Sequence, residues 1–228
     1  MLNYELLAPG HELLIMKIGS SEWLQVIVDG ARAFDLDLDR HHTELFAVHA
    51  TELLHWNNTI NLTTIIDPFE VAVKHFVDSL APAKLVSPGV TLLDIGSGSG
   101  FPGIPLKVIM PSLAVTLIDA SRKRVNFLKH VIRTLKLEGI QALHIRAEDL
   151  ADDPAYRRHF DFITSRALTD LKSFIRQARP LLAVGGQMIA LKGLVDQTEL
   201  ETVSSNILAV ETYMLPFARS KRSIFKIQ

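Results

Sequence analysis

The sequence predicts an α/β fold in which a mostly parallel sheet, covered by helices on both faces, follows an N-terminal helical extension. Two patterns predict it. After residue 89, short apolar runs alternate with longer helix-like stretches, as they do in repeated strand–helix units. Before residue 86, apolar residues recur at helical spacing instead. We therefore expect a helical region over residues 1–85 and a sheet domain over residues 86–228.

The helical region carries two start signals. Ser20 or Ser21 can cap a first helix. The segment Asp67-Pro68-Phe69-Glu70 is stronger, because an Asp cap, a Pro in the first turn and a Glu three residues after the cap all suit a helix start. This helix is expected to end near Leu80, before Ala81-Pro82. Between the two starts, helical spacing is seen in Phe46, Ala50, Leu53 and Leu54.

The sheet domain is expected to contain five strands with helices between them. The predicted strands are Thr91–Ile95, Ala114–Ile118, Ala142–Ile145, Phe160–Thr164 and Gln187–Leu191. The predicted helices cover residues 102–110, 121–137 and 169–182. Because such sheets bind ligands at the carboxyl ends of their strands, functional residues are expected directly after each strand.

Composition excludes several classes of protein. The 228 residues include no Cys, so disulfides, thiolate metal sites and Cys nucleophiles are excluded. No apolar run approaches the ~18 residues of a membrane-spanning helix, and the N-terminus does not look like a signal peptide. We expect a cytoplasmic protein that does not enter membranes. The nine histidines show no metal-binding spacing, so no metal is expected.

Charge is unevenly distributed although the net charge is only −1. The first 45 residues hold eight acids and three bases. Residues 121–136 and 217–228 hold bases and no acid. On the predicted helix 121–137, Arg122, Lys129 and Arg133 share one stripe beside an apolar face. A polyanion could therefore dock on one face, although such a stripe can also be a solvated surface.

A glycine-rich segment, Leu93–Gly103, follows the first predicted strand. It lacks the Lys and Ser/Thr of a phosphate-binding P-loop. Gly98, Gly100 and Gly103 match a dinucleotide fingerprint, and Asp119 lies 21 residues after Gly98, where such sites hold an acid. These features alone allow a nicotinamide-dependent oxidoreductase.

Asp94, two residues before the first glycine, favours a different ligand. A carboxylate at this position repels a pyrophosphate but suits a cationic ligand with an ammonium group. S-adenosylmethionine is such a ligand, because it carries a sulfonium and an ammonium and no phosphate.

Polar residues follow the other predicted strands as well. Asp119 can accept both hydrogen bonds of a ribose diol, or cap the next helix. Ala147 and Glu148 can meet an adenine edge, or begin a short helix. Arg166 is placed at the mouth of the site, although an exposed Arg can also be merely solvated.

A family resemblance rests on seven motifs that occur in order along residues 45–228. They are Trp56-Asn57, Asn61-Leu62-Thr63, Lys74–Ser79, Leu93–Pro105, Arg122–Leu128, Ser165-Arg166-Ala167 and Ala190–Gly193. Together they resemble the bacterial RsmG family, formerly called glucose-inhibited division protein B, which methylates N7 of a guanine in 16S ribosomal RNA. The resemblance implies a Rossmann-like, class I S-adenosylmethionine-dependent methyltransferase sheet acting on 16S rRNA or the small ribosomal subunit, with no DNA partner.

The resemblance also implies roles for individual residues. Cofactor binding is implied for Asp94, Gly96, Ser97, Gly98, Gly100, Phe101, Asp119, Ala147, Glu148 and Arg166. Catalysis or RNA binding is implied for Arg146, Arg166 and Lys192, and substrate contact for Asn61 and His75, which we extend to Arg122 and Arg133. The chain departs from the family at Phe101, where Leu is usual.

The implied chemistry needs no general base, because guanine N7 carries a lone pair and no proton. Proximity and alignment are then the main contributions of the protein. Side chains read the deep, narrow groove of A-form RNA poorly, so an unpaired target base is expected. Besides the oxidoreductase, a non-catalytic rRNA-binding or ribosome-assembly factor remains an alternative.

Overall fold

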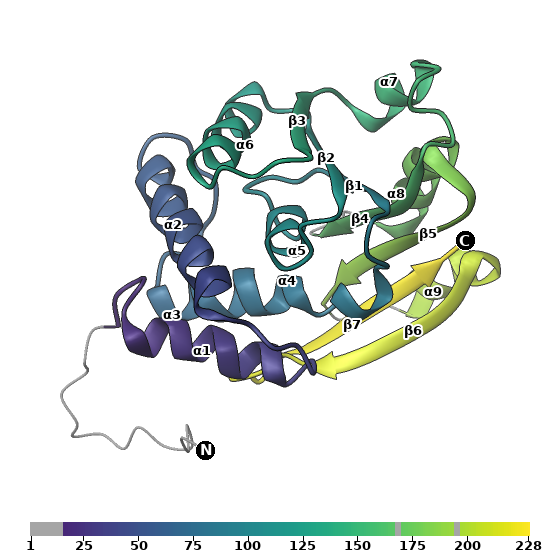
Figure 1. Ribbon diagram of the computed structural model, residues 1–228. Helices are drawn as coiled ribbons and strands as arrows, with labels where there is room; N and C mark the ends of the chain where they lie inside the picture. Colours follow the sequence, from purple (N-terminus) through teal and green to yellow (C-terminus); the bar gives the residue numbers. More distant parts are fainter. Residues whose placement is uncertain (1–15, 167–169, 194–196) are drawn as a thin grey trace.

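A seven-stranded sheet forms the centre of the computed structural model, which describes residues 16–166, 170–193 and 197–228 (Figure 1). Its strand order is β3-β2-β1-β4-β5-β7-β6. The strands are β1 (Thr91–Ile95), β2 (Ala114–Asp119), β3 (Ile140–His144), β4 (Phe160–Arg166), β5 (Leu182–Lys192), β6 (Ile207–Met214) and β7 (Lys221–Ile227). The first five are parallel, while β7 is antiparallel to both β5 and β6.

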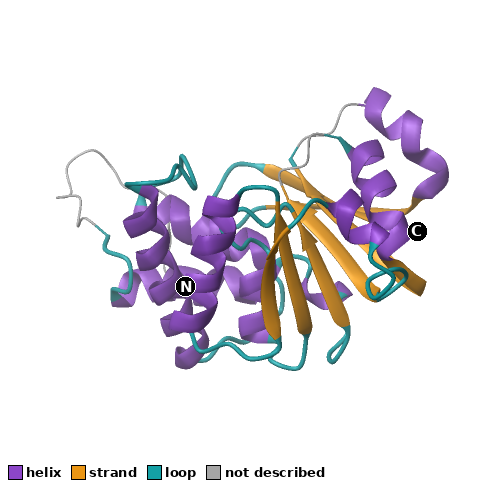
Figure 2. Cartoon of the chain, turned by 90° about the horizontal axis from the view of Figure 1, so that it is seen from above, coloured by secondary structure: helices purple, strands orange, loops and turns teal. Residues whose placement is uncertain are grey.

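Helices cover the two faces of the sheet, as the view from above shows (Figure 2). They are α1 (Ser21–Arg32), α2 (Arg40–Asn57), α3 (Pro68–Glu70), the π-helix η1 (Val71–Val77), α4 (Asp78–Leu80), α5 (Gly103–Ile109), α6 (Arg122–Thr134), α7 (Ala147–Asp152), α8 (Leu171–Ala178) and α9 (Gln197–Val203). Short 3₁₀ turns occur at Ala83–Leu85, Arg179–Leu181 and Ser204–Asn206. Together with the sheet, these elements confirm the predicted α/β class.

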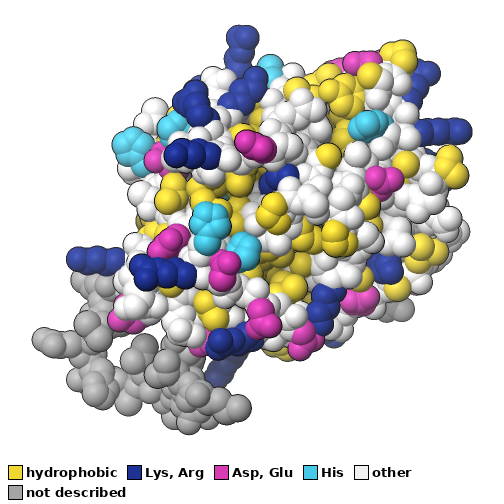
Figure 3. Space-filling model, viewed as in Figure 1, with side chains coloured by type: hydrophobic (Ala, Val, Ile, Leu, Met, Phe, Trp, Pro, Cys, Tyr) yellow, Lys and Arg dark blue, Asp and Glu magenta, His cyan; other side chains and the backbone are white. Residues whose placement is uncertain are grey.

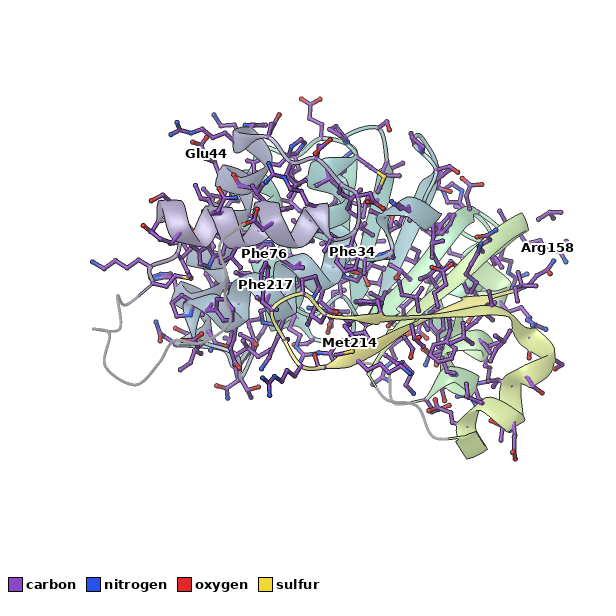
Figure 4. The ribbon with its side chains drawn as sticks, turned by 90° about the horizontal axis from the view of Figure 1, so that it is seen from below. Phe34, Glu44, Phe76, Arg158, Met214 and Phe217 are labelled. Carbon is purple, nitrogen blue, oxygen red and sulfur yellow. The ribbon has the colours of Figure 1, made fainter. Side chains whose placement is uncertain are left out.

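Each face of the sheet has its own apolar core, because neighbouring residues of a strand point to opposite faces. Leu92 packs with the helices α1 to α6, whereas Leu93 packs with α7, α8 and α9. The N-terminal helices are part of the first core: Trp23, Phe46 and Phe76 are fully buried there, and Phe76 is labelled in Figure 4. The predicted division between residues 85 and 86 stays a prediction.

The helix starts behave as their sequences indicate. Ser20 caps α1 by accepting from the Trp23 amide. Asp67 caps α3 by accepting from the Glu70 amide at 2.9 Å, and the helical segment ends at Leu80 as expected. The sequence did not indicate that Val71–Val77 winds as a π-helix, a form that often occurs at functional sites.

The main difference from the sequence prediction lies at the C-terminus. The hairpin β6–β7 was not predicted; β6 is the largely exposed edge strand, whereas β7 lies between β5 and β6 and buries Ile224, Phe225 and Ile227. The third predicted strand lies two residues too late at its start, and the predicted helix 169–182 is α8 followed by a 3₁₀ turn. The described part of the chain does not include Ala167, residue 169 or the first 15 residues.

Within the described residues, no helix is both long and apolar enough to cross a membrane. In the same part of the chain, no three His, Asp or Glu side chains gather closely enough to hold a metal ion.

Candidate functional site

The carboxyl ends of four parallel strands meet along one edge of the sheet. Ile95 of β1 lies beside Ile118 of β2, and Asp94 lies beside Thr164 of β4, two residues before Arg166. This register brings the residues that follow β1, β2, β4 and β5 to one edge of the sheet, as the parallel topology predicts.

The loop after β1 is shaped by its glycines. Gly96 has a φ of +69°, and a Cβ added there would meet no atom within 4 Å, so its backbone faces open space. Gly103 is different: a Cβ there would lie 2.4 Å from Leu117 and 2.9 Å from Asp94 Oδ2. Glycine at position 103 therefore allows the Asp94 carboxyl to approach the backbone.

Asp94 is fully buried beneath this loop. Its Oδ2 accepts a hydrogen bond from the Gly103 amide at 3.0 Å. Its Oδ1 is buried and accepts no hydrogen bond from the described residues. Burial raises the pKa of Asp94 to about 8, against the opposing effects of the Gly103 amide and the Arg166 charge. Oδ1 of Asp94 is thus available to accept a hydrogen bond from a ligand.

Asp119 ends β2 and is also buried. Its Oδ2 accepts from the Gly98 amide at 3.0 Å and its Oδ1 from the Ser121 amide at 2.8 Å. The cap of α6 is Ser121, not Asp119, so the capping interpretation of Asp119 is wrong. Asp119 instead fixes the glycine-rich loop against the start of α6.

A first cavity, of about 140 Å³, opens between this loop and β3; we call it the acidic cavity. Its lining contains the carboxylates of Asp119 and Glu148, with Gly96 and the buried Ala147. Arg146 lines it too, as the exposed residue before α7. Glu148 accepts from Gln177 Nε2 at 2.9 Å. The remaining lining residues are Ile95, Ile118, Ala120, Ile145 and Gln177.

A second cavity, of about 350 Å³, lies beyond β4 and β5; we call it the basic cavity. Four of its side chains are cationic and one is a carboxylate. It is lined by Ile65, Lys74, His75, Asp78, Arg166, Leu191, Lys192, Gly193, Tyr213 and Arg222. The structure therefore brings Arg166 and Lys192 together but leaves Arg146 in the acidic cavity, so the three predicted catalytic bases do not form one group.

Arg166 is held by the π-helix. Its Nη1 donates to the Lys74 carbonyl at 2.9 Å, to the His75 carbonyl at 3.3 Å and to Ser79 Oγ at 3.3 Å. Nη1 also lies 3.7 Å from Asp78 Oδ2, and the guanidinium carbon lies 4.9 Å from the centre of the Phe101 ring. Burial lowers the pKa of Arg166, while the charges of Asp78 and Asp94 oppose the shift. Arg166 is not the solvated mouth residue of the alternative interpretation.

His75 is neutral and has a defined orientation. Arg166 Nη2 lies 3.3 Å from His75 Nδ1 and can only donate, so the ring proton is on Nε2, which donates to Thr63 Oγ1 at 2.9 Å. Burial lowers the pKa of His75 to about 3, and the charge of Arg166 adds to the effect. The ring stacks on Phe101 with centroids 4.7 Å apart. Phe101 also stacks on the buried His49 of α2, 4.8 Å away, and so joins the glycine-rich loop to the N-terminal helices.

Three residues of the basic cavity were not predicted as site residues from the sequence: Asp78, Tyr213 and Arg222. Asp78 Oδ1 accepts from the Tyr213 hydroxyl at 2.9 Å and lies 3.4 Å from Arg222 Nε. Burial raises the pKa of Tyr213, and the Asp78 charge adds to the effect. Arg222 belongs to a basic run that the sequence did show, whereas nothing in the sequence marks Tyr213.

The remaining predicted residues lie in different places. Lys192 Nζ pairs with Glu199 Oε1 at 2.5 Å beside the basic cavity. Asn61 is exposed and lines neither cavity. Arg122 and Arg133 are exposed on α6, and Lys and Arg side chains gather over this helix in the space-filling view (Figure 3).

The residues of the acidic cavity, together with Asp94 beneath the glycine-rich loop, fit S-adenosylmethionine. The unpaired, buried Oδ1 of Asp94 suits an ammonium group, and the open space at Gly96 admits a ligand against the backbone. Asp119 and Glu148 add negative charge and hydrogen-bond acceptors for an uncharged nucleoside, where a pyrophosphate would be repelled.

Comparisons with known proteins agree with this geometry. The family model "GidB: rRNA small subunit methyltransferase G" matches residues 42–225. The chain belongs to this family. It is 48% identical over 166 residues to ribosomal RNA small subunit methyltransferase G of Desulfitobacterium hafniense, covering 73% of this chain and 69% of that protein. It is 39% identical to the protein of that name from Geobacter sp. strain M21, covering 89% and 96% of the two chains.

Solved structures show the same fold at low sequence identity. A SAM-dependent methyltransferase from Aquifex aeolicus superposes with a TM-score of 0.55 at 16% identity, covering 73% of this chain and 96% of that one. A putative S-adenosyl-L-methionine-dependent methyltransferase from Methanococcus maripaludis gives 0.53 at 16% identity, covering 77% and 90%.

The protein is thus an rRNA methyltransferase with a Rossmann-like sheet that uses S-adenosylmethionine. The nicotinamide-dependent and non-catalytic alternatives are both set aside by this membership.

Proposed function

We propose that the protein methylates N7 of a guanine in the 16S rRNA of the small ribosomal subunit, in the cytoplasm. The observation that carries the proposal is the pair of cavities of opposite charge at the ends of β1 and β4. The printed names of the relatives, which specify the small subunit, support the choice of rRNA.

The chain's own residues would bind and orient the reactants. Asp94 would hold the cofactor's ammonium, and Asp119 its ribose, while the glycine-rich loop leaves room at Gly96. When bound, S-adenosylmethionine supplies an electrophilic methyl group. Guanine N7 needs no deprotonation, and His75 of the basic cavity, whose pKa burial lowers to about 3, is not required as a base. Alignment and electrostatics then provide the rate enhancement.

The basic side chains suit a polyanionic substrate. Lys74, Lys192 and Arg222 border the basic cavity, and Arg166 positions the π-helix beside it. Arg122 and Arg133 extend the positive surface along α6, away from the cleft. We therefore propose α6 as an rRNA contact outside the site of methyl transfer.

The proposal is tested by methyl transfer to ribosomes from a strain that lacks the gene. Purified protein and labelled S-adenosylmethionine are incubated with naked 16S rRNA and with 30S subunits, and the modified base is mapped by cleavage at 7-methylguanine. We expect a single labelled guanine in 16S rRNA. Label at another atom, or in 23S rRNA alone, would contradict the proposal.

A further inference from the structure

Asp78 is the one carboxylate among the residues that line the basic cavity. It is buried at the start of α4 and is held in place from two strands of the C-terminal hairpin, by Tyr213 of β6 and Arg222 of β7. Tyr213 is itself fixed by an edge-to-face contact with Phe34, which is labelled in Figure 4. The carboxylate is therefore rigidly placed.

The two oxygens of this carboxylate are used differently. Oδ1 accepts from the Tyr213 hydroxyl at 2.9 Å and lies 3.4 Å from Arg222. Oδ2 lies 3.7 Å from Arg166 Nη1, beyond hydrogen-bonding distance, and no donor among the described residues bonds to it. One oxygen of a charged carboxylate is thus available to a ligand in the cavity.

Three of the four cations of the cavity are occupied, whereas the buried Nε of Arg222 has no hydrogen-bond partner among the described residues. Lys74 and Lys192 pair with Glu70 and Glu199 at 2.5 Å, and Arg166 donates to backbone carbonyls of the π-helix. Cations also attract every nucleotide alike, because each carries a phosphate. Discrimination between bases needs a group that reads a base edge.

We propose that the basic cavity receives the target guanine and that Asp78 Oδ2 accepts from its Watson–Crick edge. Guanine presents two donors there, N1–H and the N2 amino group, and adenine lacks the N1 donor. A buried carboxylate that is left without these donors is penalised, so it selects guanine. The edge is exposed only when the base is unpaired, as in other enzymes that extrude a base. This inference rests on the proposed function.

The test replaces the target guanosine by inosine, which lacks the N2 amino group but keeps N7. Reconstituted 30S subunits carry either base at the position mapped above, and kcat/KM for methyl transfer is measured for each. We expect the wild-type enzyme to prefer guanosine roughly 10- to 100-fold, the effect of one hydrogen bond to a charged group. In Asp78→Asn, we expect the preference to fall below about 5-fold.

Tyr213→Phe is the matched control, because it removes the hydroxyl that donates to Asp78 Oδ1 but keeps the carboxylate. It is expected to lower kcat/KM for both bases and to preserve their ratio. Binding of S-adenosylhomocysteine verifies that each variant is folded.

Two results would overturn the inference: equal use of guanosine and inosine by the wild-type enzyme, or an unchanged ratio in Asp78→Asn. In the second case Asp78 serves only to tie the hairpin to the helix. Failure of the wild-type enzyme to methylate any rRNA would instead refute the proposed function.

Discussion

The two cavities of the cleft differ both in charge and in origin. The acidic cavity is built by segments that directly follow β1, β2 and β3, and its carboxylate Asp119 accepts hydrogen bonds from the nearby amides of Gly98 and Ser121. The basic cavity combines the π-helix, the ends of β4 and β5 and the C-terminal hairpin. A small cation can be bound by local structure, whereas the polyanionic substrate meets a surface assembled from distant segments.

Under the proposed function, the two cavities would hold two ligands of opposite charge. Asp94 is buried, Arg166 is half-buried beside the basic cavity, and each affects the other's pKa. If the two cavities are functionally distinct, changes on one side should leave the ligand of the other largely unaffected.

Arg166→Lys should produce the largest difference between the effect on rRNA methylation and the effect on cofactor affinity. Lys keeps the charge but cannot reproduce the forked contacts to Lys74, His75 and Ser79, so we expect kcat/KM for rRNA methylation to fall roughly 100-fold. The affinity for S-adenosylhomocysteine, measured by calorimetry, should change by less than about 5-fold.

Arg176→Lys, an exposed change on α8, is the control and should leave both quantities unchanged. An equal loss of activity and cofactor affinity in Arg166→Lys would show that the two cavities act as one.

Gly96→Ala should lower mainly the affinity for the cofactor, the reverse of the effect expected for Arg166→Lys. The added methyl enters open space that the cofactor is expected to use, so the S-adenosylhomocysteine affinity should fall roughly 10- to 100-fold. The positive φ of residue 96 should also cost about 1–2 kcal/mol of stability, measured by urea unfolding.

Gly89→Ala separates these two effects. Gly89 also has a positive φ, of +78°, and open space at its Cβ, but it lies in the turn before β1 at the other end of the strand. Its substitution should reduce stability similarly and leave cofactor affinity intact. A similar loss of affinity in both variants would mean that strain, not the ligand contact, is responsible.

The raised pKa of Asp94 predicts that cofactor affinity and stability depend on pH, with a smaller effect than those of the two substitutions above. A cationic ligand binds the ionised carboxylate, so S-adenosylhomocysteine affinity should increase by up to about 10-fold per pH unit from pH 6 to the pKa near 8, then level off. Because folding raises this pKa from 3.8, the free protein should lose stability as pH rises between 3.8 and about 8, by at most ~1.4 kcal/mol per unit.

Asp94→Asn cannot ionise and should remove both slopes, as measured by calorimetry and urea unfolding across the same pH range. Retention of the wild-type slopes would assign them to other groups.

Arg133→Glu should have the smallest effect. One exposed cation of α6 is reversed, so rRNA affinity should weaken several-fold and the slope of log K against log salt should shrink by about one unit. Arg158→Glu is the control, since Arg158 lies at the end of the molecule away from the N-terminal helices (Figure 4). If both reversals weaken binding alike, the effect reflects net charge rather than contact at α6.

Prediction from the sequence succeeded where contacts are local. The strand–glycine loop–helix unit with Asp94, and the position of Asp119 at the end of the next strand, follow from period and turn chemistry within single strand–helix units. The sequence did not indicate which cavity Arg146 borders, because position after a strand does not say which neighbouring cavity a side chain lines.

The hairpin β6–β7 was missed for a related reason. β6 lies at the sheet edge with exposed residues such as Met214, so its apolar pattern is weak, and β7 is a strand between β5 and β6. The contact between Tyr213 and Asp78 spans 135 residues, and it exists only because β7 pairs with β5.

The sequence by itself determined the α/β class, the family and the carboxylates of the acidic cavity, because these depend on short-range periodicity and motif chemistry. Only the tertiary structure decided which cations share a cavity, that Arg166 is engaged by the π-helix, and that Asp78 keeps an oxygen available. Those properties follow from strand order and burial, which arise when segments far apart in the chain pack together.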